Sequence, residues 1–189
     1  MKTSRLEAFS DGVIAVIITI MVLDLKIPRG IDLRALASDL PTFVTYALSF
    51  ITTGIYWNNH HHMLHATKRI DGRIMWANLH LLFWLSLIPF TTGWAGENYF
   101  APVPTAAYGF VLMMAAVAYT LLQTAIVAYN GTDSELAKAI GNDWKGKLSL
   151  ASYIVSIPVA FFAPLLSLAL FIAVAVLWFA PDRRIEHVT

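Results

Sequence analysis

The stretch RLEAFSDGVIAVIITIMVLDL, from Arg5 to Leu25, decides the fold class. Its apolar run is close to the roughly 20 residues that a membrane-spanning helix needs. Its first two turns nevertheless hold polar residues, namely Arg5, Glu7, Ser10 and Asp11. A carboxylate inside a membrane is costly and usually faces a partner within the protein. We therefore predict a first membrane helix over about residues 8–25, with Asp11 turned toward other helices.

The composition extends this interpretation to the whole chain. Of its 189 residues, 58% are hydrophobic and 13% are charged, whereas soluble domains carry about 25% charged residues. The absence of cysteine excludes disulfides, thiol catalysis and thiolate metal sites, and a net charge of +1 gives no reason to expect nucleic-acid binding. We predict an all-α integral membrane protein without a cleaved signal peptide, because the first apolar run is too long for one.

Six apolar stretches can each span a bilayer, and we predict a single six-helix domain over residues 1–189. The predicted spans are about residues 8–25, 41–57, 74–94, 105–129, 148–162 and 165–179. The second span is expected to continue as a helix through NNHHHMLH. The segment AGENYFAPVP, with Gly96, is expected to form a loop. Short polar helices are expected over about residues 33–39 and 133–143.

The distribution of Lys and Arg supports this topology. With the N-terminus in the cytoplasm, the segments on the inside hold ten basic residues: Lys2, Arg5, Lys68, Arg69, Arg73, Lys138, Lys145, Lys147, Arg183 and Arg184. The segments on the outside hold Lys26, Arg29 and Arg34. Because cytoplasmic loops of membrane proteins are enriched in Lys and Arg, we predict a multi-pass protein of the cell (inner) membrane with both termini in the cytoplasm.

The first helix carries an apolar stripe on the side away from Asp11. Val16, Ile20 and Leu23 recur at helical spacing, Thr19 lies about 60° from Val16, and Asp11 lies about 140° from it. Such a stripe is more often plain packing. Repeated around a symmetry axis, however, it forms a hydrophobic constriction of the kind that gates ion flow by dewetting.

The second polar patch is YWNNHHHMLHATKR, residues 56–69, and it leaves two alternatives open. A histidine-rich membrane metalloenzyme would use His60, His61, His62 and His65, completed by Asp11, Glu7 or His80. A proton-coupled transporter would use Asp11 and one histidine as a relay, although it would be expected to show internal repeats. No nucleophile elbow, phosphate-binding loop or dinucleotide motif is present, so we expect no enzyme and no cofactor.

The chain resembles the prokaryotic branch of the transmembrane protein 175 family. RLEAFSD matches the RxxxFSD motif that opens the first helix of that family, and the likeness continues through YWNNHHHMLH and WANLHLLFWLSLIPFTTG. The resemblance implies a homotetrameric, potassium-permeable cation channel lined by the first helix of each subunit. It also implies modest preference for K⁺ over Na⁺ and no cofactor other than the permeant ion.

The resemblance assigns roles to individual residues. The family's pore-lining hydrophobic positions fall on Val16, Ile20 and Leu23, and its pore-facing threonine falls on Thr19. A structural role in holding helices together near the cytoplasmic end is implied for a polar set: Arg5, Phe9, Ser10, Asp11, His61 and Asn78. Lipid, monovalent cations and further copies of the chain are the expected partners.

Overall fold

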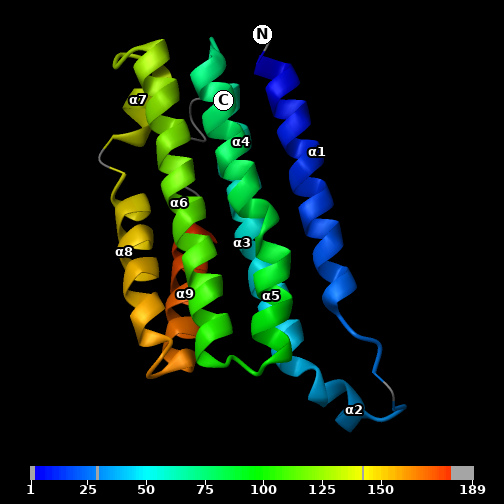
Figure 1. Ribbon diagram of the computed structural model, residues 1–189. Coiled ribbons are helices and arrows are strands. Elements are labelled where there is room, and N and C mark those ends of the chain that lie inside the picture. The colour runs from blue at the N-terminus through cyan, green and yellow to red at the C-terminus, as the bar shows by residue number, and fades with distance from the viewer. Residues whose placement is uncertain (1–2, 29, 142, 180–189) are drawn as a thin grey trace.

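The computed structural model describes residues 3–28, 30–141 and 143–179, and these residues form an all-α bundle (Figure 1). The helices are α1 (Thr3–Met21), α2 (Leu33–Ser38), α3 (Leu40–His65), α4 (Gly72–Ser86), α5 (Ile88–Glu97), α6 (Pro102–Asn130), α7 (Glu135–Ile140), α8 (Trp144–Val159) and α9 (Pro164–Phe179), with a 3₁₀ turn at Val22–Asp24. Lys2, Arg29, Arg183 and Arg184, which belong to the predicted charge distribution, lie outside the described residues.

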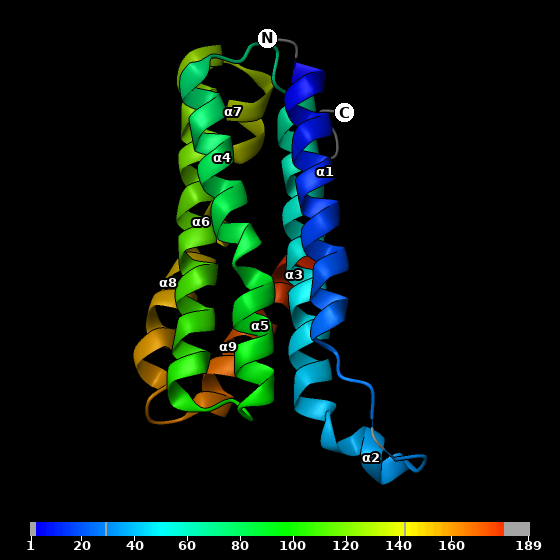
Figure 2. The ribbon, with the colours of Figure 1, turned by 45° about the vertical axis from the view of Figure 1, so that its right-hand side comes forward.

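Successive long helices run in opposite directions, in the order α1, α3, α4 with α5, α6, α8 and α9 (Figure 1). Helix α1 stands at one edge and packs against α3, α4 and α5. Helices α8 and α9 pack against each other and against α6, and α9 also packs against α3. A turn of the view keeps α1 and α8 at opposite edges (Figure 2). The predicted all-α architecture is confirmed.

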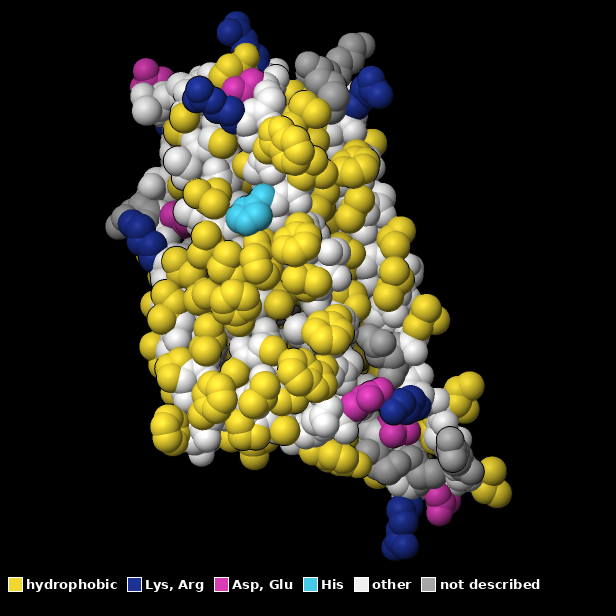
Figure 3. Space-filling view, viewed as in Figure 1, with side chains coloured by type: hydrophobic (Ala, Val, Ile, Leu, Met, Phe, Trp, Pro, Cys, Tyr) yellow, Lys and Arg dark blue, Asp and Glu magenta, His cyan; other side chains and the backbone are white. Residues whose placement is uncertain are grey.

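Apolar side chains cover the middle of the bundle, as expected for a surface that meets lipid. Charged side chains gather mainly toward the two ends of the face shown in Figure 3. Among the described residues, two helical stretches are long and apolar enough to cross a membrane by length and composition, namely residues 72–97 and α6, and α9 is apolar but shorter.

The predicted third span is interrupted. Helix α4 ends at Ser86 and α5 begins at Ile88, with the Leu87 N–H bonded to the Trp84 carbonyl at 3.2 Å. Pro89 follows at once. Its ring removes a backbone donor and clashes with a regular helix, so the helix breaks just before it. The pass therefore consists of two helices instead of the continuous span over residues 74–94.

Gly96 lies within α5 and not in the predicted loop. A Cβ at this position would lie 2.6 Å from the Thr42 Cα and in contact with the Thr45 hydroxyl, so the backbones of α3 and α5 approach as closely as glycine allows. Small residues permit this close helix packing in membranes. The reversal instead occurs at Tyr99 and Phe100, which have positive φ angles of 49° and 58°.

Candidate pore-lining face and its polar anchor

Helix α1 presents two different faces. Its buried side chains are Leu6, Ser10, Ile14, Ile17 and Met21. The opposite side includes the predicted pore positions. Val16 is 55% exposed, Ile20 is 46% exposed, and Leu23, in the turn that follows, is 78% exposed. Half-exposed aliphatic side chains are expected to find cover from lipid or from another protein surface.

Thr19 lies on the exposed side of α1, and its hydroxyl proton is already used in hydrogen bonds within the helix. Its hydroxyl donates to the Ala15 carbonyl at 3.0 Å and to the Val16 carbonyl at 2.9 Å. A hydroxyl that donates its proton to its own helix keeps lone pairs for other contacts. Thr19 can therefore offer an oxygen ligand from the exposed face without leaving a donor unsatisfied.

An open groove runs beside this face. Its lining comes from α1 and from the junction of α4 and α5: Ala8, Phe9, Gly12, Val13, Val16, Ile17, Ile20, Ser86, Pro89 and Phe90. The groove is mainly apolar, and it places the break at Leu87 next to the exposed side of α1. Phe9, which the motif places in the structural set, is 52% exposed and lines this groove.

A buried hydrogen-bonded chain joins α1 to α4 and α3. The Ser10 hydroxyl donates to the Leu6 carbonyl at 2.8 Å and accepts from Asn78 Nδ2 at 2.9 Å, while Asn78 Oδ1 lies 2.7 Å from His60 Nε2. Ser10, Asn78 and His60 are each fully buried. Because Asn78 faces His60 with its oxygen, His60 must donate from Nε2. The polarity of the chain is thus set by the backbone of α1.

Two further contacts join α1 to α3 near the Thr3 end. Trp57 Nε1 donates to Asp11 Oδ1 at 3.0 Å, and His61 Nδ1 lies 2.9 Å from Glu7 Oε1. Each helix contributes its two residues at i and i+4, so both side chains lie on one face. Since the helices are antiparallel, Glu7 meets His61 and Asp11 meets Trp57, one turn apart.

We call these contacts the polar anchor: the chain of Ser10, Asn78 and His60, and the pairs Trp57–Asp11 and His61–Glu7. The pairing of residues within the polar anchor differs from the predicted one. Asn78 and Ser10 come together as expected for a structural set, but the histidine bonded to Asn78 is His60, whereas His61 faces Glu7. Asp11 bonds to a tryptophan instead of a histidine. Arg5 is exposed and forms no ion pair within the part of the chain that the structure describes.

Sequence reasoning missed Glu7, Trp57 and His60 as members of the anchor. The signal was present in the spacing, since Glu7 and Asp11 are one turn apart and so are Trp57 and His61. The run of three histidines hid it, because His60, His61 and His62 point in three directions about 100° apart. Composition alone does not say which of these directions faces Asn78.

The histidine patch does not form a metal site. His61 stacks on Trp57 and on His65, with ring centroids 6.2 and 6.0 Å apart. Within residues 3–28, 30–141 and 143–179, no three His, Asp or Glu side chains are arranged to hold a metal ion. The metal-binding alternative is therefore not supported there. The relay alternative also lacks its expected hydrogen bond, because Asp11 is bonded to Trp57.

The fold and this anchor define an all-α membrane protein whose first helix leaves an apolar face uncovered. A family model described as "Endosomal/lysosomal potassium channel TMEM175" matches residues 5–89. A Chryseobacterium protein named as a potassium channel is 50% identical over 186 residues, which cover 98% of this chain and 97% of that protein. The chain belongs to the TMEM175 family. This is a family of channels and not of enzymes, which excludes the metalloenzyme.

Two other comparisons agree with this assignment. The crystal structure of a potassium-selective channel TMEM175 homologue from Chamaesiphon minutus superposes with a TM-score of 0.84 at 26% identity, covering 95% of this chain and 97% of that one. A human protein named as the endosomal/lysosomal proton channel TMEM175 is 33% identical over 96 residues, which cover 44% of this chain and 19% of the human one. The likeness to the human protein is therefore confined to part of each chain.

Proposed function

We propose that this protein is a potassium-permeable cation channel of the cell membrane. In this proposal, four copies surround a pore lined by α1. The observation that carries it is the uncovered stripe of Val16, Ile20 and Leu23, opposite a fully packed face of the same helix. The names of the Chryseobacterium and Chamaesiphon relatives, which are potassium channels, support the choice of ion.

The chemistry of the stripe suggests how ions would be selected. Rings of Val16, Ile20 and Leu23 around a four-fold axis would form a narrow apolar passage that an ion crosses only after losing part of its hydration shell. K⁺ holds its water less tightly than Na⁺, so a modest K⁺ preference follows without a ring of backbone carbonyls. The lone pairs of Thr19 would replace some of the lost water within the same passage.

The polar anchor has a positional role in this proposal. It lies at the Thr3 end of α1, which we place in the cytoplasm with both termini. Its contacts to α3 and α4 come from the side of the helix turned away from the stripe. Ser10 and Asp11 would therefore fix the rotation of α1 about its axis, so that the stripe and not the carboxylate faces the ions.

Ion flux through reconstituted protein tests the proposal. Liposomes containing the purified chain should pass K⁺, and Ile20→Ala or Leu23→Ala should raise the flux because each widens the apolar passage. Leu121→Ala is the matched control, since Leu121 is an exposed aliphatic residue too, at 50%, but lies on α6. No K⁺ flux from assembled protein, or equal effects of Leu121→Ala and Leu23→Ala, would contradict the proposed pore.

Cross-linking tests the assembly independently of conduction. The chain contains no cysteine, so a single substitution gives an unambiguous reaction. Leu23→Cys should form disulfide-linked dimers within an oligomer whose mass is four times that of the 21.0 kDa chain. Leu121→Cys should not cross-link. A monomeric mass in detergent and in nanodiscs, or cross-linking only at Leu121, would overturn the arrangement around α1.

A further inference from the structure

A small, partly open cavity lies between α3, α6, α8 and α9, on the side of the subunit away from α1. Its volume is about 50 Å³, and Figures 1 and 2 show α1 and α8 at opposite edges of the bundle. Its polar and aromatic lining includes Tyr56 and Asn59 on α3, Tyr119 on α6, Tyr153 on α8, Trp178 on α9, and Asp143. The cavity is separate from the exposed stripe and from the polar anchor.

The walls of the cavity are aromatic. The rings of Tyr56 and Tyr119 meet edge to face with centroids 6.0 Å apart, and Tyr153 and Trp178 complete the lining from the other two helices. The face of an aromatic ring carries negative charge density and attracts cations. Trp178 already holds one cation in this way, since Lys145 Nζ lies 5.7 Å from its ring centroid.

A carboxylate completes this lining. Asp143 precedes α8, and its Oδ1 accepts from the Gly146 N–H at 3.2 Å. Its position is fixed by a left-handed backbone with φ of 37° and by Gly146, where any Cβ would collide with the carboxylate. Capping a helix accounts for one oxygen. Within the described residues Asp143 forms no ion pair, and a cation beside this lining, Lys145, has its ammonium group over Trp178.

Two phenol hydroxyls in the lining are available to a guest, as far as the described residues show. Within the described part of the chain, neither Tyr56 nor Tyr153 forms a side-chain hydrogen bond. Tyr119, by contrast, donates to the Asn59 carbonyl at 3.3 Å. A phenol oxygen that borders open space can accept a hydrogen bond from a guest. The lining thus combines a negative charge, free acceptors and aromatic faces.

We propose that this cavity binds a compact primary ammonium group, with Asp143 as its counter-ion and the rings of Tyr56, Tyr119, Tyr153 and Trp178 as its walls. The volume corresponds to roughly three to five water sites of about 10–15 Å³ each. That space suits methylammonium or ethanolammonium and excludes bulky amines. Binding at this site does not depend on ion conduction.

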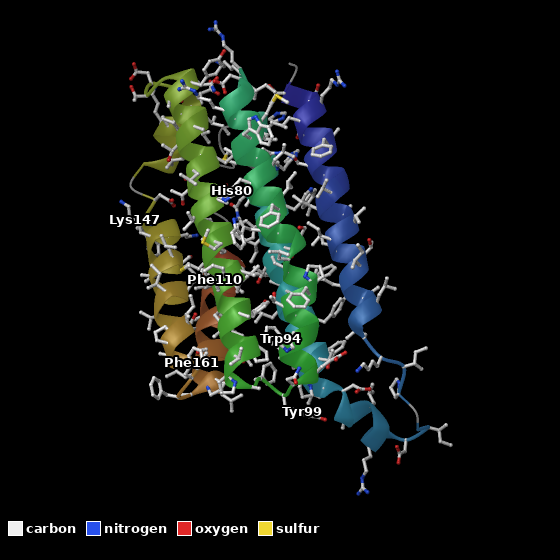
Figure 4. The ribbon with its side chains drawn as sticks, viewed as in Figure 1. His80, Trp94, Tyr99, Phe110, Lys147 and Phe161 are labelled. Atoms are coloured by element: carbon white, nitrogen blue, oxygen red, sulfur yellow. The ribbon has the colours of Figure 1, made fainter. Side chains whose placement is uncertain are left out.

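The level of the cavity in the bundle suggests two sources for the ammonium group. Figure 4 places Lys147 well below the upper ends of α4 and α6 and near the level of His80. Trp144, Lys145 and Lys147 share the first turns of α8, and aromatic and basic side chains together are typical of the lipid-headgroup layer. The ligand is therefore either a free amine or the ammonium of an aminophospholipid headgroup.

Binding of free amines is measured first, on the purified full-length protein in detergent. Ethanolammonium should bind saturably by saturation-transfer NMR, whereas ethylene glycol, its uncharged analogue of the same shape, should not. Asp143→Asn should weaken binding about tenfold or more, because it removes the charge but keeps an N-cap that tolerates a left-handed backbone. Asp133→Asn is the control, since it makes the same change outside the cavity.

Nanodiscs distinguish the lipid source. The protein is compared in phosphatidylglycerol alone and with phosphatidylethanolamine added, and co-purified lipid is measured by native mass spectrometry. Retention of phosphatidylethanolamine that Asp143→Asn abolishes assigns the site to a headgroup, and binding of ethanolammonium alone assigns it to a free amine. Either result supports the proposal. Tyr153→Phe, which keeps the ring, provides a second variant that should weaken binding.

Three results would overturn the proposal. The first is the absence of saturable binding of methylammonium, ethanolammonium and phosphatidylethanolamine to folded protein. The second is equal binding of ethylene glycol, which would mean that the charge is not recognised. The third is unchanged binding in both Asp143→Asn and Tyr153→Phe, which would place the ammonium elsewhere on the molecule.

Discussion

The indole of Trp57 donates a hydrogen bond to the carboxylate of Asp11 at 3.0 Å, and this contact joins the first two long helices of the bundle. Asp11 was expected to need a partner because it lies in a membrane helix, and the partner is a neutral donor. A neutral donor keeps the half-buried carboxylate hydrogen-bonded without bringing a second charge to the contact.

Replacing Trp57 by Phe should remove this donor while keeping most of the ring. We expect a lower thermal midpoint in detergent, corresponding to roughly 1–2 kcal/mol, since bonds to charged groups contribute about 1.5–3 kcal/mol and this one is partly exposed. Trp76→Phe, on a tryptophan that is 75% exposed, should change little. In an Asp11→Ala background the effect of Trp57→Phe should disappear. An equal drop in both backgrounds would mean that ring packing, and not the hydrogen bond, is responsible.

Asn78 should be among the least replaceable polar residues of the bundle. Asn78→Leu keeps the approximate volume but leaves Ser10 and His60 without their shared partner. Buried polar groups left unsatisfied cost about 1–3 kcal/mol each, so we expect poor yield of folded protein or a strongly lowered thermal midpoint. Asn98→Leu is the matched control, because Asn98 is exposed and its side chain donates to the Trp94 carbonyl of the preceding helix turn. Similar stability of the two variants would argue against the buried chain.

The contact between α3 and α5 predicts a difference between two glycines. Gly96→Ala should destabilise the protein by roughly 1–3 kcal/mol, as overpacking does, because the new methyl group meets the Thr42 backbone. Gly54→Ala should be neutral or stabilising, since nothing lies within 4 Å of its added Cβ and alanine favours the helix. Thermal unfolding of both variants checks this, and a stabilising Gly96→Ala would contradict the close approach.

Thr19 tests the chemistry of the proposed pore without changing its width. Thr19→Val removes the oxygen but keeps the branched shape, so K⁺ flux should fall about two-fold or more while the apolar rings stay in place. A two-fold change corresponds to about 0.4 kcal/mol of stabilisation of the permeating ion lost with this oxygen. Thr124→Val removes an equally exposed hydroxyl from α6 and should leave the flux unchanged. Unaltered flux in Thr19→Val would mean that this oxygen does not face the ions.

Much of the architecture could be predicted from hydropathy and turn residues. The all-α fold, the short helix α2 and the second long helix continuing through the histidines all follow from local pattern. The break at Leu87 did not follow, because Pro89 is compatible with either a kink or a new start. Gly96 was assigned to a turn because glycine permits turns, whereas here it permits close contact with α3. That distinction depends on a neighbour far away in the sequence.

One part of the candidate site could likewise be predicted from local pattern, and the other part could not. Helical periodicity was enough to separate the Val16, Ile20 and Leu23 face from Asp11, and the structure leaves those three side chains exposed. Periodicity within one helix cannot say which residue of another helix lies opposite. The pairing of His60 with Asn78, and of Trp57 with Asp11, depends on the relative rotation of α1, α3 and α4. That rotation is set by packing throughout the bundle.

Helix α8 is shorter than the thickness of a typical hydrocarbon layer. Its 16 residues extend about 24 Å, against a hydrocarbon layer of about 30 Å, while α6 with 29 residues extends about 44 Å. A bilayer meets such a mismatch by thinning locally or by tilting the protein, each at modest cost. We therefore expect lipids with shorter acyl chains to be favoured more beside α8 and the equally short α9 than beside α6. A change in membrane thickness should therefore affect this subunit mainly at the edge opposite α1.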